Sequence, residues 1–361
     1  MKILYLTPSV NNEGGVAKSL SVKTNYFIEN YNYSIHILTQ NNGNSPLFHR
    51  FHPQIKMEDI TLKGTIISRF FSYKNAINHK INEINPDVVV VSDNGLKGYL
   101  VPILLKKKLP IVFECHGSIF VEEKKNSHWV TLLKAKYKRF FAKYFTRFIV
   151  LSEESRKEWN TSNCEIIPNS IAVNPSKKAQ LQATNCIVIA RHSYEKGLDR
   201  LLLIWEEIQK SQPNWTLEIY GDFSQNDSIL QLAERLELQT TVRFFEPIRN
   251  LEEKYLSASI MLMTSRTEGF PMAILEANSL GLPVIAYDCP IGPKSIIQNN
   301  ETGFLIQNNN KTEFVKQLNL LMNDIDLRIK MGENAQIKML HYNHQTIMEK
   351  WQKLFESLIT H

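Results

Sequence analysis

Short runs of β-branched and other apolar residues recur along the chain, and helical patterns separate them. Nearly continuous apolar runs of this length are typical of parallel strands that helices cover on both faces. The sequence therefore predicts an α/β protein. The expected strands, besides the one that opens each half, are Ile35–Leu38, Val88–Val91, Ile111–Glu114, Phe148–Leu151, Leu217–Tyr220, Val242–Phe245, Ile260–Thr264 and Val284–Tyr287.

Both halves of the chain open in the same way. A strand over 2–7 leads into a glycine-containing loop and a helix, and a strand over 186–190 leads into the loop 191–197 and a helix over 198–210. Strand, glycine loop and helix begin a nucleotide-binding α/β unit. At 361 residues the chain is long enough for two such domains.

The domain boundary is expected in the polar stretch 170–183. This places an N-terminal domain at 1–170, a second domain at 171–340 and a C-terminal helix within 341–361. The helix is expected over His341–Ile359, because four apolar residues share one face and must pack on something, most simply the N-terminal domain. These four are Ile347, Trp351, Leu354 and Leu358.

Composition excludes several classes of protein. With 43% hydrophobic and 22% charged residues the chain is not disordered. No apolar run reaches the roughly 18 residues of a membrane-spanning helix, and the first residues do not resemble a signal peptide, so we expect a soluble, cytoplasmic protein. Four scattered cysteines, without a C-x-x-C pair, indicate buried thiols rather than zinc ligands or disulfides.

Charge is distributed unevenly. Residues 1–170 carry 23 Lys and Arg against 14 Asp and Glu, and residues 171–361 carry 19 against 22. Within 134–147 there is no acidic residue, and aromatic residues alternate with six basic ones. A helix of this kind can lie on anionic lipid at the inner face of the cell membrane. Alternatively, its aromatic side chains pack on their own sheet. No nucleic-acid-binding motif accompanies the charge.

The densest pattern lies in 260–293. It predicts a strand, a loop over Ser265–Phe270 and a helix over Pro271–Leu280 with Pro271 at its first position. Free N–H groups at a helix start bind anions. Glu268 in the loop and Glu276 in the helix can accept hydrogen bonds from sugar hydroxyls on either side of a phosphate, which suits a nucleotide-sugar. The alternative for two such glutamates is solvated surface charge.

Together, Glu268-Gly269-Phe270, Leu275-Glu276-Ala277 and Gly281-Leu282-Pro283-Val284-Ile285 resemble the Glu-x7-Glu signature of the retaining family-four glycosyltransferases. The resemblance implies the GT-B fold, with two Rossmann-like doubly wound domains facing a central cleft. It implies that Glu268 contacts the transferred sugar, that Glu276 holds the ribose, and that Gly269, Phe270, Pro271 and Met272 line the donor site.

A second stretch supports the resemblance. Residues 191–199 are similar to the family's Gly-Arg-x4-Lys-Gly-x-Asp motif, with Ala190 in place of the glycine. The resemblance implies that Arg191 and Lys196 hold the donor diphosphate, as their counterparts do in the family. The chemistry agrees, since a guanidinium forks onto phosphate oxygens and an ammonium adds a mobile charge.

Two elements of the first half also match. Gly14 and Gly15 resemble the family's loop facing the donor phosphates, and they lack the full G-x-G-x-x-G of a dinucleotide cofactor site. His116 follows a predicted strand, where the family often has a histidine that contacts the primary hydroxyl of the donor sugar. A purely structural histidine is the alternative.

The resemblance implies a metal-independent retaining transferase with Glu268, His116, Arg191 and Lys196 as catalytic residues. It would move galactose, N-acetylgalactosamine, N-acetylglucosamine or glucose from a UDP-sugar to a lipid-linked or surface glycan in bacterial capsule, O-antigen or exopolysaccharide synthesis. The Asp288–Pro293 turn resembles relatives of that kind. A nucleotide-sugar epimerase of the same architecture and a non-catalytic sugar-nucleotide-binding subunit remain alternatives.

Overall fold

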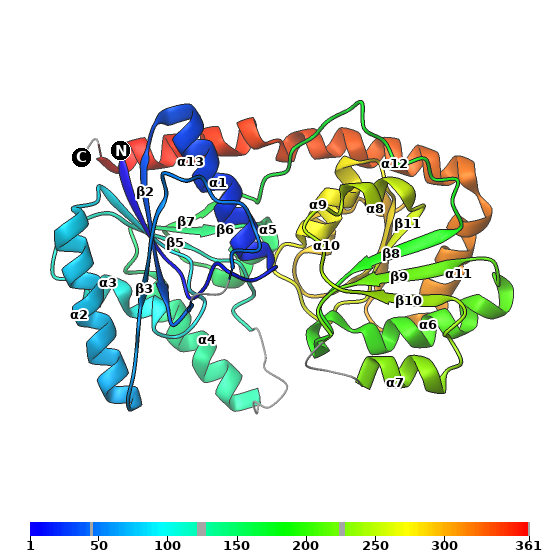
Figure 1. The fold of residues 1–361 in the computed structure, drawn as a ribbon, viewed down its shortest axis with the longest axis horizontal. Helices are drawn as coiled ribbons and strands as arrows, with labels where there is room; N and C mark the ends of the chain where they lie inside the picture. Colours follow the sequence, from blue (N-terminus) through cyan, green and yellow to red (C-terminus); the bar gives the residue numbers. More distant parts are fainter. Residues whose placement is uncertain (44–45, 121–127, 224–227, 360–361) are drawn as a thin grey trace. The chain divides into compact units, whose positions relative to one another are not determined.

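The chain forms two compact units, each built on one parallel sheet (Figure 1). The computed structural model describes residues 1–43, 46–120, 128–223 and 228–359. Unit 1 comprises Met1–Ser170 and Gln345–His361, and unit 2 comprises Ile171–His344. The expected α/β class and the GT-B type of architecture, with a doubly wound sheet in each half, are confirmed.

Unit 1 has a seven-stranded sheet with the order β3-β2-β1-β4-β5-β6-β7. Its strands are β1 (Lys2–Leu6), β2 (Ser34–Gln40), β3 (Lys56–Ile60), β4 (Val88–Val91), β5 (Ile111–Glu114), β6 (Arg147–Val150) and β7 (Cys164–Ile166). Its helices are α1 (Gly15–Tyr31), α2 (Ile66–Ile84), η1 (Gly98–Leu100), α3 (Val101–Leu104), α4 (His128–Ala142), α5 (Glu153–Trp159) and, from the end of the chain, α13 (His344–Ile359).

Unit 2 has a six-stranded sheet with the order β10-β9-β8-β11-β12-β13. Its strands are β8 (Asn185–Ile189), β9 (Thr216–Tyr220), β10 (Val242–Phe245), β11 (Ile260–Met263), β12 (Val284–Asp288) and β13 (Gly303–Gln307). Its helices are η2 (Tyr194–Lys196), α6 (Leu198–Ser211), α7 (Ser228–Arg235), α8 (Glu252–Ser257), α9 (Met272–Ser279), α10 (Pro293–Ile296), α11 (Lys311–Asn323), α12 (Ile325–Met339) and η3 (Leu340–Tyr342).

The strands that the sequence pattern missed are β3, β7 and β13, which all lie at a sheet edge. An edge strand has one neighbour and less cover, so it does not need a continuous apolar run. Strand β3 has the sequence KMEDI and exposes most of its residues. The expected inner strands are all present.

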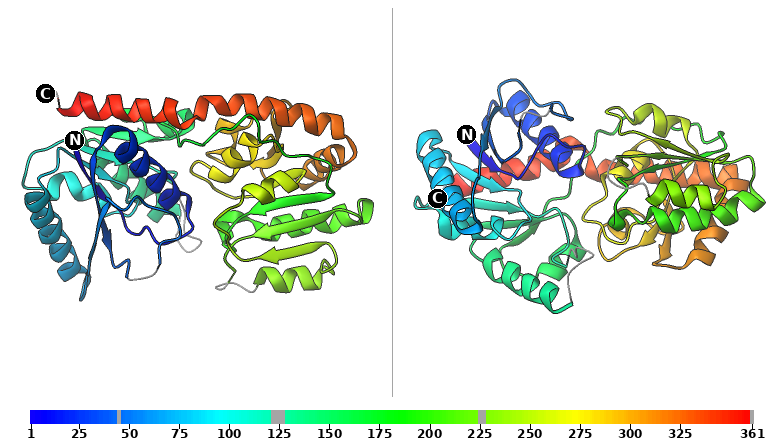
Figure 2. Two further views of the ribbon diagram at one scale, coloured as in Figure 1. Left: turned by 45° about the horizontal axis from the view of Figure 1, so that its top comes forward. Right: turned by 60° about the horizontal axis from the view of Figure 1, so that its bottom comes forward.

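Helices cover both faces of the unit 1 sheet. On one face, α1 and α13 pack together over β1 and β2 (Figure 2). The centres of the Phe27 and Phe355 rings lie 5.6 Å apart. The other face is covered by α2, α3, α4 and α5. The expected apolar stripe of the last helix is core, since all four of its residues are buried.

Two expected helices differ from the observed ones. The helix expected over His341–Ile359 begins only at His344, after the short turn η3. The basic stretch 134–147 is helical only as far as Ala142, because β6 begins at Arg147. Within this stretch Lys138 and Phe145 are buried, whereas Phe140 and Tyr144 are exposed.

No helix in the described part of the chain combines the length and the apolar character that a bilayer span requires. Cys115, Cys186 and Cys289 are buried, Cys164 is partly buried, and all four thiols are free, as expected.

Candidate functional site

Three of the predicted site residues of unit 2 lie on two loops at the carboxyl ends of neighbouring strands. Arg191 and Lys196 follow β8, and Glu268 follows β11, which pairs with β8 in parallel. Strand order reverses between these two strands, since β9 and β10 continue on one side and β12 and β13 on the other. Ligands of open α/β sheets bind beyond the carboxyl ends of the strands at such a point.

Lys196 and Glu268 form an ion pair between the two loops. The Lys196 Nζ lies 2.7 Å from Glu268 Oε1, and Ser265 Oγ donates to the same oxygen over 2.6 Å. The Glu268 side chain is only 8% exposed, so it is not the solvated surface charge of the alternative interpretation. A carboxylate held in this way can accept a hydrogen bond from a sugar hydroxyl.

The Arg191 guanidinium is exposed, and within the described residues it has no ionic partner. It begins the loop whose other end carries Lys196. A guanidinium with unused donors is suited to bind phosphate oxygens bidentately.

A second ion pair, which the sequence analysis did not identify, joins the loop after β11 to the first turn of α6. Arg266 donates to both carboxylate oxygens of Asp199 over 2.8 and 2.6 Å, and to the carbonyl oxygen of Tyr194 over 2.8 Å. Its guanidinium lies 4.1 Å from the centre of the Tyr194 ring. Burial opposes ionisation of Asp199, but its hydrogen bonds from Arg266 prevail and lower its pKa. Arg266 lies two positions before Glu268 in the sequence, and this proximity was the signal that could have identified it.

The loop after β11 turns into α9 at Pro271. The structure places Pro271 before the helix, with φ −72° and ψ 99°, and not at the first helical position as expected. Gly292, in the turn after β12, packs against this loop. It has φ +107°, and a Cβ at this position would lie 2.8 Å from Pro271 Cδ and 3.1 Å from Glu268 Cβ. The turn therefore requires glycine there.

The remaining residues that were predicted to line the donor site are largely shielded from solvent. Phe270 and Met272 are buried and Gly269 is partly exposed. Glu276 is also buried, and it accepts a hydrogen bond of 3.2 Å from the Tyr255 hydroxyl. Burial, followed by the nearby Glu276 carboxylate, raises the pKa of Tyr255, so the phenol stays a donor. Tyr255 is a further residue that the sequence analysis missed.

Unit 1 carries the predicted glycine loop. Gly14 caps α1, and its N–H donates to Asn12 Oδ1 over 2.9 Å. Strand order in the unit 1 sheet reverses between β1 and β4, so this loop also lies at a switch point. The first turn of α1, which starts at Gly15, holds no acidic residue, and its N-terminal partial charge stays available to an anion.

His116 follows β5, and its side chain is 6% exposed. Its Nε2 lies 3.5 Å from Oε1 of Glu114, a buried residue that the sequence analysis did not single out. The neighbouring Cys115 is no candidate nucleophile, because burial raises the pKa of its thiol to about 12.

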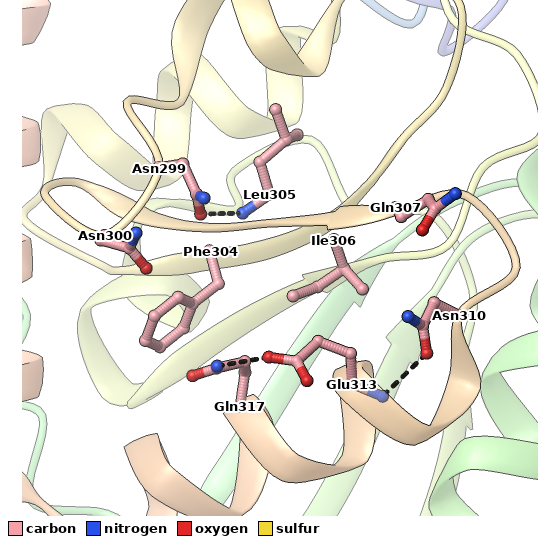
Figure 3. A pocket seen from close by; sticks show the side chains of 9 residues that line it. All are labelled: Asn299, Asn300, Phe304, Leu305, Ile306, Gln307, Asn310, Glu313 and Gln317. Carbon is pink, nitrogen blue, oxygen red and sulfur yellow. Dashed lines mark hydrogen bonds between the residues drawn. The ribbon is translucent and has the colours of Figure 1, made fainter.

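A hollow of about 480 Å³ lies at the edge of the unit 2 sheet, between β13 and α11. Figure 3 shows the side chains that line it. Asn299, Gln307 and Glu313 are among its lining residues, and none of the predicted site residues is. The hollow is therefore separate from the predicted donor residues.

Among the described residues, no three His, Cys, Asp or Glu side chains are close enough together to hold a metal ion. The sequence contains an Asp-x-Asp pair, Asp324 and Asp326, a pattern that can bind a metal ion. The prediction of a metal-independent transferase overlooked this pair. Both residues are exposed, and Asp324 caps α12 by accepting a hydrogen bond of 2.8 Å from the Leu327 N–H. Helix capping accounts for Asp324.

Two family models match the chain, one for each half. Residues 14–174 match the model described as Glycosyltransferase Family 4, and residues 174–338 match the model described as Glycosyl transferases group 1.

Individual relatives are similar over nearly the full chain. An uncharacterised glycosyltransferase of Haemophilus influenzae is 25% identical over 356 residues, which cover 97% of this chain and 98% of that protein. The amylovoran biosynthesis glycosyltransferase AmsD of Erwinia amylovora is 24% identical over 361 aligned residues, with the same coverage. A crystal structure of an S. aureus TarM mutant with fondaparinux, alpha-GlcNAc-glycerol and UDP has the same fold. Its TM-score is 0.83 at 16% identity, covering 98% of this chain and 99% of that one.

Proposed function

Because this chain belongs to the glycosyltransferases of group 1 and family 4, we propose that it moves a hexose or N-acetylhexosamine from a UDP-sugar to a lipid-linked or surface glycan. The single observation that carries the proposal is the pairing of Lys196 with Glu268 at the unit 2 switch point. AmsD, named for amylovoran biosynthesis, supports a bacterial polysaccharide, and the UDP bound to TarM supports the nucleotide.

The leaving group of such a transfer is a nucleoside diphosphate that gains negative charge. In our proposal Arg191 binds its oxygens bidentately, while Lys196 adds a second positive charge from the same loop. The helix starts at Gly14–Gly15 and at Gly269–Pro271 add backbone donors. Fixed donors of this kind stabilise developing charge in the transition state, and they let the transfer proceed without a metal ion.

The sugar and the ribose are assigned to carboxylates. Glu268 and His116 would contact the transferred sugar, and the buried Glu276 would accept from ribose hydroxyls. Tyr255 fixes the orientation of Glu276 through its hydrogen bond of 3.2 Å. A retaining outcome is part of the proposal.

We also propose that the protein is cytoplasmic and that it contacts anionic lipid through α4. Trp129, Leu133 and Phe140 of this helix are 75%, 66% and 54% exposed, and Lys136 and Lys143 beside them are exposed as well. Exposed aromatic side chains among cations are typical of interfacial helices. The buried Lys138 and Phe145 belong to the packed side of this segment.

Purified protein should be tested for thermal stabilisation and UDP release with UDP-galactose, UDP-glucose, their N-acetylamino forms, GDP-mannose and NADH. We expect one UDP-sugar to stabilise the protein by about 2.7 kcal/mol at a hundredfold excess over its dissociation constant. That sugar should also release UDP slowly, with or without EDTA. Pelleting with phosphatidylglycerol vesicles, and not with phosphatidylcholine vesicles, tests the lipid contact.

In the same assay Glu276→Gln and Arg191→Ala should lose most UDP release while the melting temperature stays close to that of the wild type. Glu234 and Arg235 are exposed and adjacent to each other in the sequence. Glu234→Gln and Arg235→Ala are therefore the matched controls. Near-normal turnover of either site variant contradicts the assignment. Conversion of a UDP-sugar to its epimer without UDP release would identify an epimerase, and binding without any turnover would identify a silent subunit.

A further inference from the structure

Unit 1 buries an ion pair at the end of β5. Lys23 of α1 is 1% exposed and Glu114 is 2% exposed, and Lys23 Nζ lies 2.5 Å from Glu114 Oε2. Ser92, at the end of β4, donates to the same oxygen over 3.1 Å. Removing two charges from water is costly, and an apolar pair of similar volume often gives equal stability. The pair therefore calls for an explanation other than stability.

Two aromatic rings complete the surroundings of Lys23. Its ammonium lies 4.0 Å from the centre of the Trp351 ring and 5.6 Å from the centre of the Tyr5 ring. Trp351 belongs to α13 and is 2% exposed. A cation over an indole face is stabilised by the ring quadrupole, and more strongly where water is excluded. The last helix thus covers the cation that holds Glu114.

The two oxygens of Glu114 have different neighbours. Oε2 contacts Lys23 and Ser92, while Oε1 faces Nε2 of His116 at 3.5 Å. Burial alone would raise the pKa of Glu114, but Lys23 and then His116 outweigh it, and the pKa lies well below its ordinary value. A carboxylate beside one imidazole nitrogen keeps a proton on that nitrogen. The other nitrogen, Nδ1, is then the one left for a ligand.

We propose that Glu114 is a positioning residue for His116, that it fixes the imidazole orientation with a proton on Nε2, and that Lys23 under Trp351 holds Glu114 in place. This inference rests on the proposed function, in which His116 contacts the transferred sugar. It assigns to α13 a part in the site through Trp351, Lys23 and Glu114.

Glu114→Gln keeps the shape of the side chain and removes its charge. We expect kcat for UDP release to fall about 10- to 100-fold with little change in the donor KM, as for other groups that orient a functional imidazole. In a His116→Ala background the same substitution should leave kcat within about twofold of the single His116 variant, since coupled residues are not additive. Equal losses in both backgrounds, or no loss in the wild-type background, would overturn the proposal.

Lys23→Met separates positioning from stability. Alone it leaves Glu114 buried without a cation and is expected to lower the melting temperature strongly. The double variant Lys23→Met with Glu114→Gln has neither of these two buried charges, so it should recover the melting temperature but not kcat. Recovery of both would show a merely structural pair. Ile77→Val, in the core of unit 1 and away from this network, controls for a modest loss of stability at unchanged kcat.

A readout independent of turnover keeps the two proposals distinguishable. Long-range ¹H–¹⁵N spectra of the full chain, with His116→Ala for assignment, report which imidazole nitrogen carries the proton. We expect the Nε2–H form in the wild type and a mixed or Nδ1–H form in Glu114→Gln. An unchanged His116 signal refutes the positioning. If Glu114→Gln changes the His116 signal as expected but the wild-type protein releases UDP from no donor, only the proposed function is refuted.

Discussion

At the scale of single residues, burial shifts the pKa of His192, which lies beside Arg191. It is 6% exposed and lies 5.4 and 5.5 Å, between ring centres, from Phe223 and Phe244. Burial lowers its pKa, and Asp222 only partly opposes this. The unfolded chain therefore takes up the proton first, so this contribution to stability is complete above pH ~6.5 and is lost as the pH falls towards the folded pKa. We expect His192→Phe to flatten the decline in melting temperature between pH 7.5 and 5.

The matched control is His79→Gln, since the His79 side chain is 76% exposed. Thermal unfolding of the three proteins at several pH values checks the prediction. If His192→Phe and His79→Gln decline as steeply as the wild type, the burial of His192 does not contribute to its acid sensitivity.

At the scale of elements, hydrogen bonds and ion pairs hold loops in place. Arg266 links the loop after β11 to Tyr194 in the loop after β8 and to Asp199 in the first turn of α6. The Asp199 side chain is 43% exposed, so the pair adds at most about 1 kcal/mol to stability. Its larger effect should be on the geometry of Lys196 and Glu268. We expect Arg266→Ala to weaken donor binding about tenfold, because small misplacements of binding groups are costly. Titration calorimetry with the UDP-sugar that the stabilisation and release assays identify measures this loss.

Arg156→Ala is the control, because it breaks an exposed Arg–Glu pair of similar length, 2.7 Å, in unit 1. Equal donor affinities of the Arg266 and Arg156 variants would show that the loops keep their geometry without the bridge. Arg266→Lys should fall between them, since a single ammonium cannot replace the fork.

At the scale of the whole molecule, unit 1 requires the last helix, α13, to complete its hydrophobic core. Six buried side chains of α13 pack over β1, β2 and α1, among them Trp351 and Phe355. At about 1.5–3 kcal/mol each, their burial is comparable with the roughly 5–15 kcal/mol stability of a whole domain. We expect a chain ending at Asn343 to lose folded unit 1 and to keep unit 2. Hydrogen exchange should then show protected amides in the strands and helices of unit 2 and none in unit 1.

Phe355→Ala in the full chain is the milder control, with an expected loss of about 3–5 kcal/mol. Protected amides in β1 and β4 of the shortened chain would show that unit 1 folds without its last helix.

Much of the fold could be predicted from the sequence because its signals are local. Apolar runs marked the inner strands, and glycine loops marked where β1 and β8 turn into helices. The motif around Glu268 and Glu276 indicated the family, which the two family models confirm. The edge strands β3, β7 and β13 escaped this reasoning, because a strand with one neighbour does not need the pattern that full burial imposes.

The sequence by itself determined the α/β class, the two sheets and the family. It also supplied the residues on which the proposed sugar-nucleotide site rests. Only the tertiary structure showed that Lys23 pairs with Glu114 under Trp351, and that Asp199 pairs with Arg266. Periodicity and motifs describe residues a few positions apart, whereas these partners are separated by 67 or more positions in the chain. Such pairs depend on strand order and on which helix covers which face, and both are set by the packing of the whole unit.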